Sequence, residues 1–195
     1  MKNLPRILMF LGAVALFGVF FFPIWRISLY APQYPNGLSM YIWVDQITDI
    51  NAIKNINILN HYVGMRMIEP DSIPEFKIFP YVIYALAALG LIAAFIDRKK
   101  VYLMFFVIIV VTGLVGMYDF YTWLYDYGHN LSPEAPIKVP GQSYMPPLLG
   151  SKWLLNFYAE SYPHTGAIFF GLPMLFSALA FWLKKSVKKG LESIS

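Results

Sequence analysis

Four long apolar stretches limit what this chain can fold into more than any other feature of its sequence. They cover about residues 7–27, 78–96, 101–121 and 165–183. Each is long enough to cross the hydrocarbon core of a bilayer, which takes about 20 helical residues. Of the 195 residues, 58% are hydrophobic and only 13% are charged, which is too apolar for a soluble domain of this size. The sequence therefore predicts a mainly α protein built on a bundle of four transmembrane helices.

The positively charged residues indicate how this bundle is oriented. Cations precede the first stretch, fill the short turn at residues 97–100, and follow the fourth stretch. They are Lys2, Arg6, Arg98, Lys99, Lys100, Lys184, Lys185, Lys188 and Lys189. Lys and Arg gather on the cytoplasmic side of membrane proteins. We therefore expect both termini in the cytoplasm of a bacterium and the two long loops outside its inner membrane. The same placement explains the net charge of +4 without a nucleic-acid partner.

These segments divide the chain into five parts. Residues 1–27 are the N-terminus and first span, 28–77 the first outer loop, and 78–121 a hairpin of the second and third spans. Residues 122–164 are the second outer loop, and 165–195 hold the fourth span and a basic cytoplasmic tail. The first span is expected to remain as an anchor, because no small-residue cleavage site follows it as in a signal peptide.

The middle of each apolar stretch contains no ionisable residue. Pumps, ion channels and proton relays usually place such residues inside the membrane. A pump or channel formed by this chain alone is therefore not expected. Any chemistry is expected in the outer loops.

The first outer loop contains the pattern of a strand followed by a helix. Turn-forming residues at 32–37 precede an alternation of apolar and polar residues over 38–44, which is typical of a half-buried strand. Asp49 is a suitable N-cap for a helix that ends near residues 60–64. This helix places His61 in its last turn and Met65 just beyond it.

The second outer loop is rich in aromatic residues and proline. The third helix is expected to continue past the membrane to about Tyr127, and an irregular proline-rich run follows. Residues 151–160 resemble a short amphipathic helix lying in the membrane interface. Together the two loops predict a small α+β region outside the membrane.

His61, Met65 and Met67 are the candidate metal ligands, with Met40 as a possible fourth, in a chain that has no cysteine. Imidazole and thioether groups suit copper, and Cu(I) needs no thiolate. The alternative is structural: His61 bonds the end of its helix, and the methionines fill gaps in a small core.

Asp119, Asp126 and His129 form a second possible site. Two carboxylates and an imidazole suit a harder metal ion or general acid–base catalysis. The alternative is that these groups make hydrogen bonds with nearby tyrosine or tryptophan side chains at the membrane surface.

Two short segments carry a resemblance to a known family. YPNGL (Tyr34–Leu38) and LNHYVGM (Leu59–Met65) resemble the pattern YPxGL…LNHYxGM of uncharacterised bacterial four-span membrane proteins. That family is associated with genes for copper-chaperone lipoproteins and for maturation factors of nitrous-oxide reductase. The resemblance implies copper handling or metalloenzyme maturation in the periplasm, with His61 and Met65 in the shared motif. Met67 lies outside it.

Three interpretations of function follow. The first is an accessory protein without enzymatic activity that presents His61, Met65, Met67 and Met40 to copper or to a periplasmic copper chaperone or metalloenzyme. The second is a docking subunit of a larger membrane complex that binds no metal, which suits the exposed aromatic character of the second loop. The third is an enzyme acting on lipid or quinone at the outer interface, for which Asp119, Asp126 and His129 are the only plausible acid–base set. No nucleophile elbow, phosphate-binding loop or HExxH motif is present.

Overall fold

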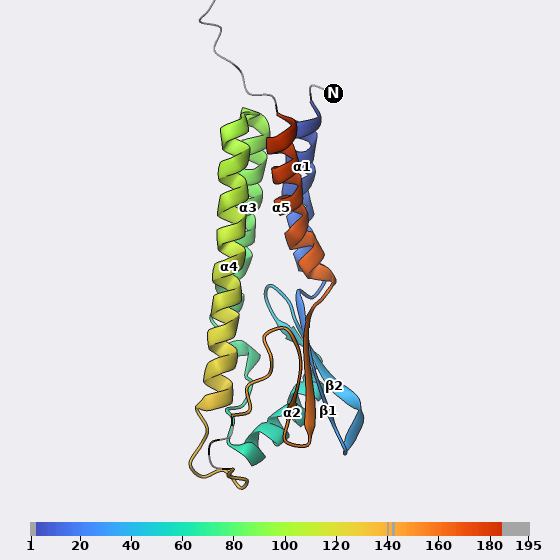
Figure 1. Cartoon of the computed structure of the whole chain (residues 1–195), viewed down its shortest axis with the longest axis vertical. Helices are drawn as coiled ribbons and strands as arrows, with labels where there is room; N and C mark the ends of the chain where they lie inside the picture. The colour runs from blue at the N-terminus through green and yellow to red at the C-terminus, as the bar shows by residue number, and fades with distance from the viewer. Residues whose placement is uncertain (1–2, 140, 142, 185–195) are drawn as a thin grey trace, which may run out of the picture.

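The computed structural model describes residues 3–139, 141 and 143–184 and has two parts, a bundle of helices and a small antiparallel sheet with a helix packed on it (Figure 1). The helices of the bundle are α1 (Leu4–Ala15), continued by the 3-10 helix η1 (Leu16–Phe20), then α3 (Glu75–Ile96), α4 (Lys99–His129) and α5 (Thr165–Leu183). The sheet and α2 (Ile50–Val63) lie at the end of the bundle opposite the start of α1. The fold is mainly helical, as predicted.

Three of these helices, α3, α4 and α5, are long and apolar enough to cross a membrane. The bounds of α5 agree with the prediction, and α4 continues beyond residue 121 to His129. With 31 residues, α4 is about 46 Å long, so it projects well past a hydrocarbon core of about 30 Å. Its C-terminal part reaches into the sheet region and packs there through Leu124.

The first apolar helix is shorter than expected. It ends at Phe20 rather than near residue 27, and Trp25–Ile27 belong to a strand. Pro23 follows the helix closely, and a proline cannot donate the hydrogen bond that a continuing helix needs. From Ile24 onward the backbone is paired with the sheet instead, beginning with the hydrogen bond from Ile24 N to Ile42 O at 2.8 Å.

The sheet has five antiparallel strands in the order β3-β2-β1-β5-β4. They are β1 (Trp25–Ala31), β2 (Tyr34–Ile42), β3 (Ile47–Thr48), β4 (Gly150–Leu154) and β5 (Phe157–Pro163). The predicted strand in the first loop is confirmed, and Leu38 and Met40 are buried as its alternation indicated. It begins earlier than predicted, however, because the turn-forming residues 35–37 are themselves part of β2.

The prediction of an amphipathic helix at residues 151–160 was wrong, because these residues form the β4–β5 hairpin. Trp153 and Tyr158 are cross-strand partners, and Leu155 makes the turn with a positive φ of 56°. The apolar positions 153, 154, 157 and 158 fit both a helical period and a hairpin folded at 155–156. Pairing with β1 decides between them, since Tyr158 to Pro163 line up with Tyr30 to Trp25.

The core has two parts. One lies among the helices and includes Met9, Leu16, Tyr102 and Ile109. The other lies between one face of the sheet, α2 and the C-terminal part of α4, and includes Ile27, Met40, Ile56 and Leu124. The sheet therefore has a covered face, which packs on α2 and α4, and an opposite face.

The ends of the helices that lie away from the sheet are joined by Asp97 in the α3–α4 turn. Its carboxylate accepts hydrogen bonds from Lys184 at 2.5 Å and from the Tyr102 hydroxyl. Burial acts to raise the pKa of Asp97, but these hydrogen bonds and the charges of Lys184 and Arg6 outweigh it, and the pKa lies below 3.8. Arg6, residues 98–100 and Lys184 thus gather at one end; Lys2, Lys185, Lys188 and Lys189 lie outside the described residues.

Candidate functional site

The LNHYVGM segment forms the end of α2 and the turn that follows it. Asp49 caps the start of the helix by accepting a hydrogen bond from Ala52 N at 3.0 Å. At the other end Gly64 adopts a left-handed conformation with φ 81°, and Met65 N bonds Asn60 O at 2.9 Å. A Cβ at position 64 would lie 2.8 Å from Ala135 Cβ. Glycine is needed here for both its φ and its close contact with the second loop. The predicted N-cap and helix end are confirmed.

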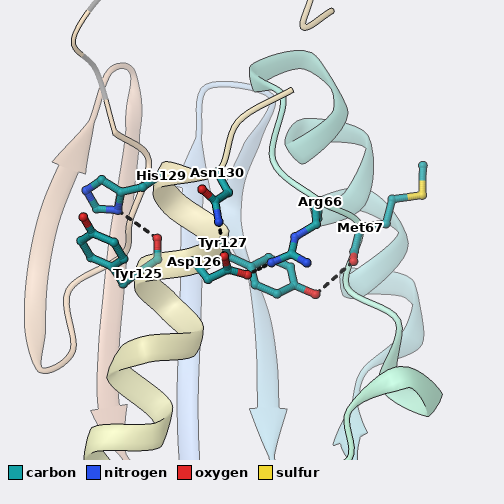
Figure 2. A network of polar contacts seen from close by, with 7 residues as sticks. All are labelled: Arg66, Met67, Tyr125, Asp126, Tyr127, His129 and Asn130. Atoms are coloured by element: carbon teal, nitrogen blue, oxygen red, sulfur yellow. Dashed lines mark hydrogen bonds and ion pairs between the residues drawn. The ribbon is translucent and has the colours of Figure 1, made fainter. Parts of the chain in front are cut away.

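The four candidate copper ligands lie in different surroundings. Met40 is 3% exposed and packs in the core beneath the sheet, whereas His61 is exposed on the last turn of α2. Met65 is partly buried and lines a small cavity. Met67 is 55% exposed, and its side chain points away from Arg66 and α4 (Figure 2). The fold leaves two accessible donors, the His61 imidazole and the Met67 thioether, and places Met40 in the interior.

Residues 65–68 are held in place by polar side chains of α2. The side-chain amide of Asn57 bonds both backbone groups of Ile68: Nδ2 donates to Ile68 O at 3.0 Å, and Oδ1 accepts from Ile68 N at 2.7 Å. Asn60 Nδ2 donates to Arg66 O at 3.3 Å. This pairing satisfies backbone groups that have no sheet or helix partner. The segment is thereby fixed along one side of α2.

The C-terminal part of α4 holds the same segment from the other side (Figure 2). Arg66 forms an ion pair with Asp126, and its guanidinium lies 5.3 Å from the centre of the Tyr127 ring. The Tyr127 hydroxyl donates to Met67 O at 3.1 Å. Residues 65–68 therefore form a clamped bridge between α2 and α4.

One residue of the second predicted site, Asp126, belongs to this clamp. Asp126 is occupied by Arg66 and by Asn130 Nδ2, and His129 Nδ1 lies 2.9 Å from Tyr125 O. The His129 ring also stacks on Tyr125 with centroids 4.0 Å apart. Asp119 and Asp126 share a helix face but are separated by two turns, about 10 Å along the axis. Among the described residues, no group of three or more His, Asp or Glu side chains is arranged to hold a metal ion.

Two small cavities lie where the LNHYVGM segment meets the second loop. One, of about 50 Å³, is lined by Leu59, Asn60, Val63 and Met65 from the segment and by Leu29, Tyr144, Pro146, Leu154 and Phe157. The other, of about 160 Å³, lies near the surface beside residues 131–139. Val63 and Tyr144 line both. The Tyr144 hydroxyl is buried without a hydrogen-bond partner, and the smaller cavity has room for a water molecule that could supply one.

No protein-family model, curated protein or solved structure matches this chain. The copper-related family suggested by YPNGL and LNHYVGM therefore stays a prediction. In the structure, both segments have local structural roles: Gly37 lies beneath the Tyr30 ring, and Gly64 ends α2 against the second loop.

Sequence reasoning missed the residues of the clamp. Asn57, Arg66 and Tyr127 carry no recognisable motif, and Arg66 and Asp126 are 60 residues apart in the chain. A single available signal was the pair of asparagines at 57 and 60. Asparagine side chains often bond nearby backbone groups.

Proposed function

We propose that this protein is a four-span accessory protein of a bacterial cytoplasmic membrane whose outer unit docks a partner protein. The outer unit consists of the sheet, α2, the C-terminal part of α4 and the loops that join them. Both termini and the α3–α4 turn lie in the cytoplasm under this proposal, because Arg6, residues 98–100 and Lys184 gather at that end. The joined helix α1–η1 supplies the fourth span. Its 17 residues extend about 28 Å, which is close to the thickness of a hydrocarbon core.

An exposed apolar patch at the tip of the outer unit is the observation that carries the docking proposal. Ile58 and Tyr62 on α2 are 53% and 49% exposed, and Ile137 and Val139 on the second loop are 46% and 41% exposed. The two segments are joined by the hydrogen bond from Ile137 N to Tyr62 O at 2.9 Å. Exposed apolar side chains gathered in this way favour contact with another protein.

The tip patch also contains a recess that suits a partner side chain. The cavity of about 160 Å³ has eight lining residues, of which five are aliphatic: Val63, Leu131, Ala135, Ile137 and Val139. The other three are Ser132, Lys138 and Tyr144. Hot spots of protein interfaces typically seat a buried side chain in a pocket of this kind. The clamp at residues 65–68 supports the same function, since a rigid surface loses less conformational entropy on binding.

Co-purification tests the docking proposal. The full-length protein with Ile137→Asp and Val139→Asp should lose a stoichiometric partner that the unchanged protein retains when isolated from metal-depleted cells. Leu149→Asp is the matched control, because Leu149 is 63% exposed in the same outer unit but does not line the recess. A partner that remains bound equally well to the double variant would contradict docking at the tip.

Copper handling in the periplasm is a second proposal, supported by the accessibility of His61 and Met67. Anaerobic titration of the purified protein with Cu(I) tests it. Stoichiometric binding that is lost in His61→Ala and Met67→Ala, but kept in Met104→Ala, would favour copper over docking alone; Met104 is an equally exposed methionine on the bundle. Cu(I) binding that is unchanged in His61→Ala and Met67→Ala would show that these two residues are not the copper ligands.

A further inference from the structure

The face of the sheet that points away from α2 and α4 has a side-chain pattern of its own. Trp25, Ile27 and Leu29 of β1 pack on the core of the covered face. Because neighbouring residues of a strand point to opposite faces, Arg26, Ser28 and Tyr30 lie on the second face. The strand register then assigns their neighbours on β2, β4 and β5. We call this surface the open face; its side chains are those of Arg26, Ser28, Tyr30, Ser39, Tyr41, Ser151, Trp153, Tyr158, Glu160 and Tyr162.

An aromatic row crosses the open face at the end of the sheet that is farther from the helices. Trp153 contacts Tyr158 with ring centroids 5.1 Å apart, and Tyr158 contacts Tyr30 at 6.3 Å. The Tyr30 ring covers Gly37 on β2, where a Cβ would lie 2.6 Å from the ring. The row therefore runs over four strands, from β4 to β2, and Trp153 at its end is 67% exposed.

A polar row lies beside the aromatic row, one step closer to the helices. It consists of Ser151, Glu160, Ser28 and Ser39 on the same four strands. Ser28 is 1% exposed, and its hydroxyl lies 2.7 Å from that of Ser39, so Ser28 supports the row from beneath. The Glu160 carboxylate is 4.0 Å from the Arg26 guanidinium. The side chains of Arg26 and Glu160 are 37% and 25% exposed, so both can make further hydrogen bonds.

The position of the aromatic row excludes the membrane surface as its binding partner. Tyr30 is five residues along β1 from Trp25, which adjoins the helical bundle. At about 3.3 Å per residue, the row lies roughly 17 Å beyond the end of the bundle. The tyrosine and tryptophan belts of membrane proteins lie at the level of the lipid headgroups, which is much closer to the bundle than this row is.

The composition of the open face also differs from that of the tip patch. Among the side chains that define it, none is aliphatic, whereas Ile58, Ile137 and Val139 make up most of the tip patch. Aromatic rings combined with hydroxyl, carboxylate and guanidinium groups match the chemistry of a sugar. The rings contact the C–H faces of pyranoses, and the polar groups bond their hydroxyls. Flat sheet faces bind oligosaccharides in other folds by the same means.

We propose that the open face binds a glycan strand, with Trp153, Tyr158 and Tyr30 stacking on successive sugar rings and the accessible side chains of Ser151, Glu160 and Arg26 bonding their hydroxyl groups. The glycan proposal depends on the proposed function in one respect, the location of the open face outside the cytoplasmic membrane. A surface in that location faces cell-wall polysaccharide. It assigns a second ligand to the outer unit, on a face separate from the tip patch.

Sedimentation with insoluble polysaccharides tests this proposal. Purified full-length protein in detergent is mixed with peptidoglycan sacculi, chitin or cellulose, and the bound fraction is measured after centrifugation. We expect retention by at least one of these polymers and about tenfold weaker retention for Trp153→Ala combined with Tyr158→Ala, because two stacking rings are removed. Single variants Glu160→Gln and Ser151→Ala keep the aromatic row and should weaken retention less.

Trp182→Ala is the matched control, because Trp182 is 77% exposed on α5 at the opposite end of the molecule and should not affect retention. Thermal unfolding of every variant checks that the fold is kept. Failure of all three polymers to retain the unchanged protein, or equal retention of the double variant, would overturn the glycan proposal. Either result leaves partner docking at Ile137 and Val139 intact, since that experiment changes other residues and measures co-purification.

Discussion

At the scale of single residues, the outer unit depends on a few side chains that hold irregular backbone in place. Asn57 and Asn60 bond the backbone of Ile68 and Arg66, and the Arg66 side chain pairs with Asp126 of α4. Of these residues, the sequence indicated only Asp126, as part of a possible metal or acid–base site. The structure uses them for hydrogen bonds that helices and strands do not supply.

Gly64 provides the residue-scale prediction. Gly64→Ala should lower the free energy of unfolding by about 1–3 kcal/mol, because alanine is strained at a φ of 81° and its Cβ would crowd Ala135. Thermal or denaturant unfolding in detergent measures the change. Gly116→Ala is the control, since a Cβ there meets nothing within 4 Å and a helical alanine should be neutral or stabilising. A similar loss of unfolding free energy in both variants would show that the turn at Gly64 does not require glycine.

At the scale of elements, the sequence predicted the long helices better than the strands. The apolar pattern and the length of residues 165–183 predict a single element, a long helix, and the structure contains that helix. Residues 151–160 allow two different elements, because the spacing of Trp153, Leu154, Phe157 and Tyr158 fits a helix and a hairpin equally well. Only pairing with β1, more than 120 residues earlier, selects the hairpin. The first helix ends early, at Phe20, because the backbone that follows it pairs with the same sheet.

The β4–β5 turn provides a prediction at this scale. Leu155 has a φ of 56°, which is unfavourable for a residue with a Cβ. Leu155→Gly should therefore raise the free energy of unfolding by about 0.5–1 kcal/mol, measured as a higher midpoint of thermal unfolding. Leu149→Gly removes an exposed leucine of the same unit that lacks a positive φ and should give no gain. Destabilisation by Leu155→Gly would contradict this interpretation of the turn.

The α3–α4 turn should make stability depend on pH. The pKa of Asp97 lies below its ordinary value of 3.8 in the folded protein, so its ionised form stabilises the fold above pH 3.8. This contribution is lost as the pH falls through 3.8 towards the lower folded pKa. The midpoint of thermal unfolding should fall over that window, and Asp97→Asn should reduce the fall. Asp45→Asn, at an exposed position in the outer unit, is the control; equal pH profiles for both variants would contradict the role of Asp97.

At the scale of the whole molecule, three helices long enough to cross a membrane carry a folded unit at one end, and basic residues gather at the other. Composition and charge predicted this division, because both patterns are local in the sequence. The clamp, the cavities and the open face were not predictable, since each joins residues that come together only after folding. The proposed functions of the tip patch and the open face both require the outer unit to lie outside the cytoplasm.

Cysteine labelling in intact cells tests that arrangement most directly, and the chain suits it because it contains no cysteine. Asn156→Cys lies at the exposed β4–β5 turn, and Lys100→Cys lies at an exposed position in the first turn of α4, beside the α3–α4 turn. The account predicts that a membrane-impermeant maleimide labels the first variant in intact cells and the second only after the membrane is permeabilised. Labelling of Lys100→Cys in intact cells while Asn156→Cys stays protected would contradict it.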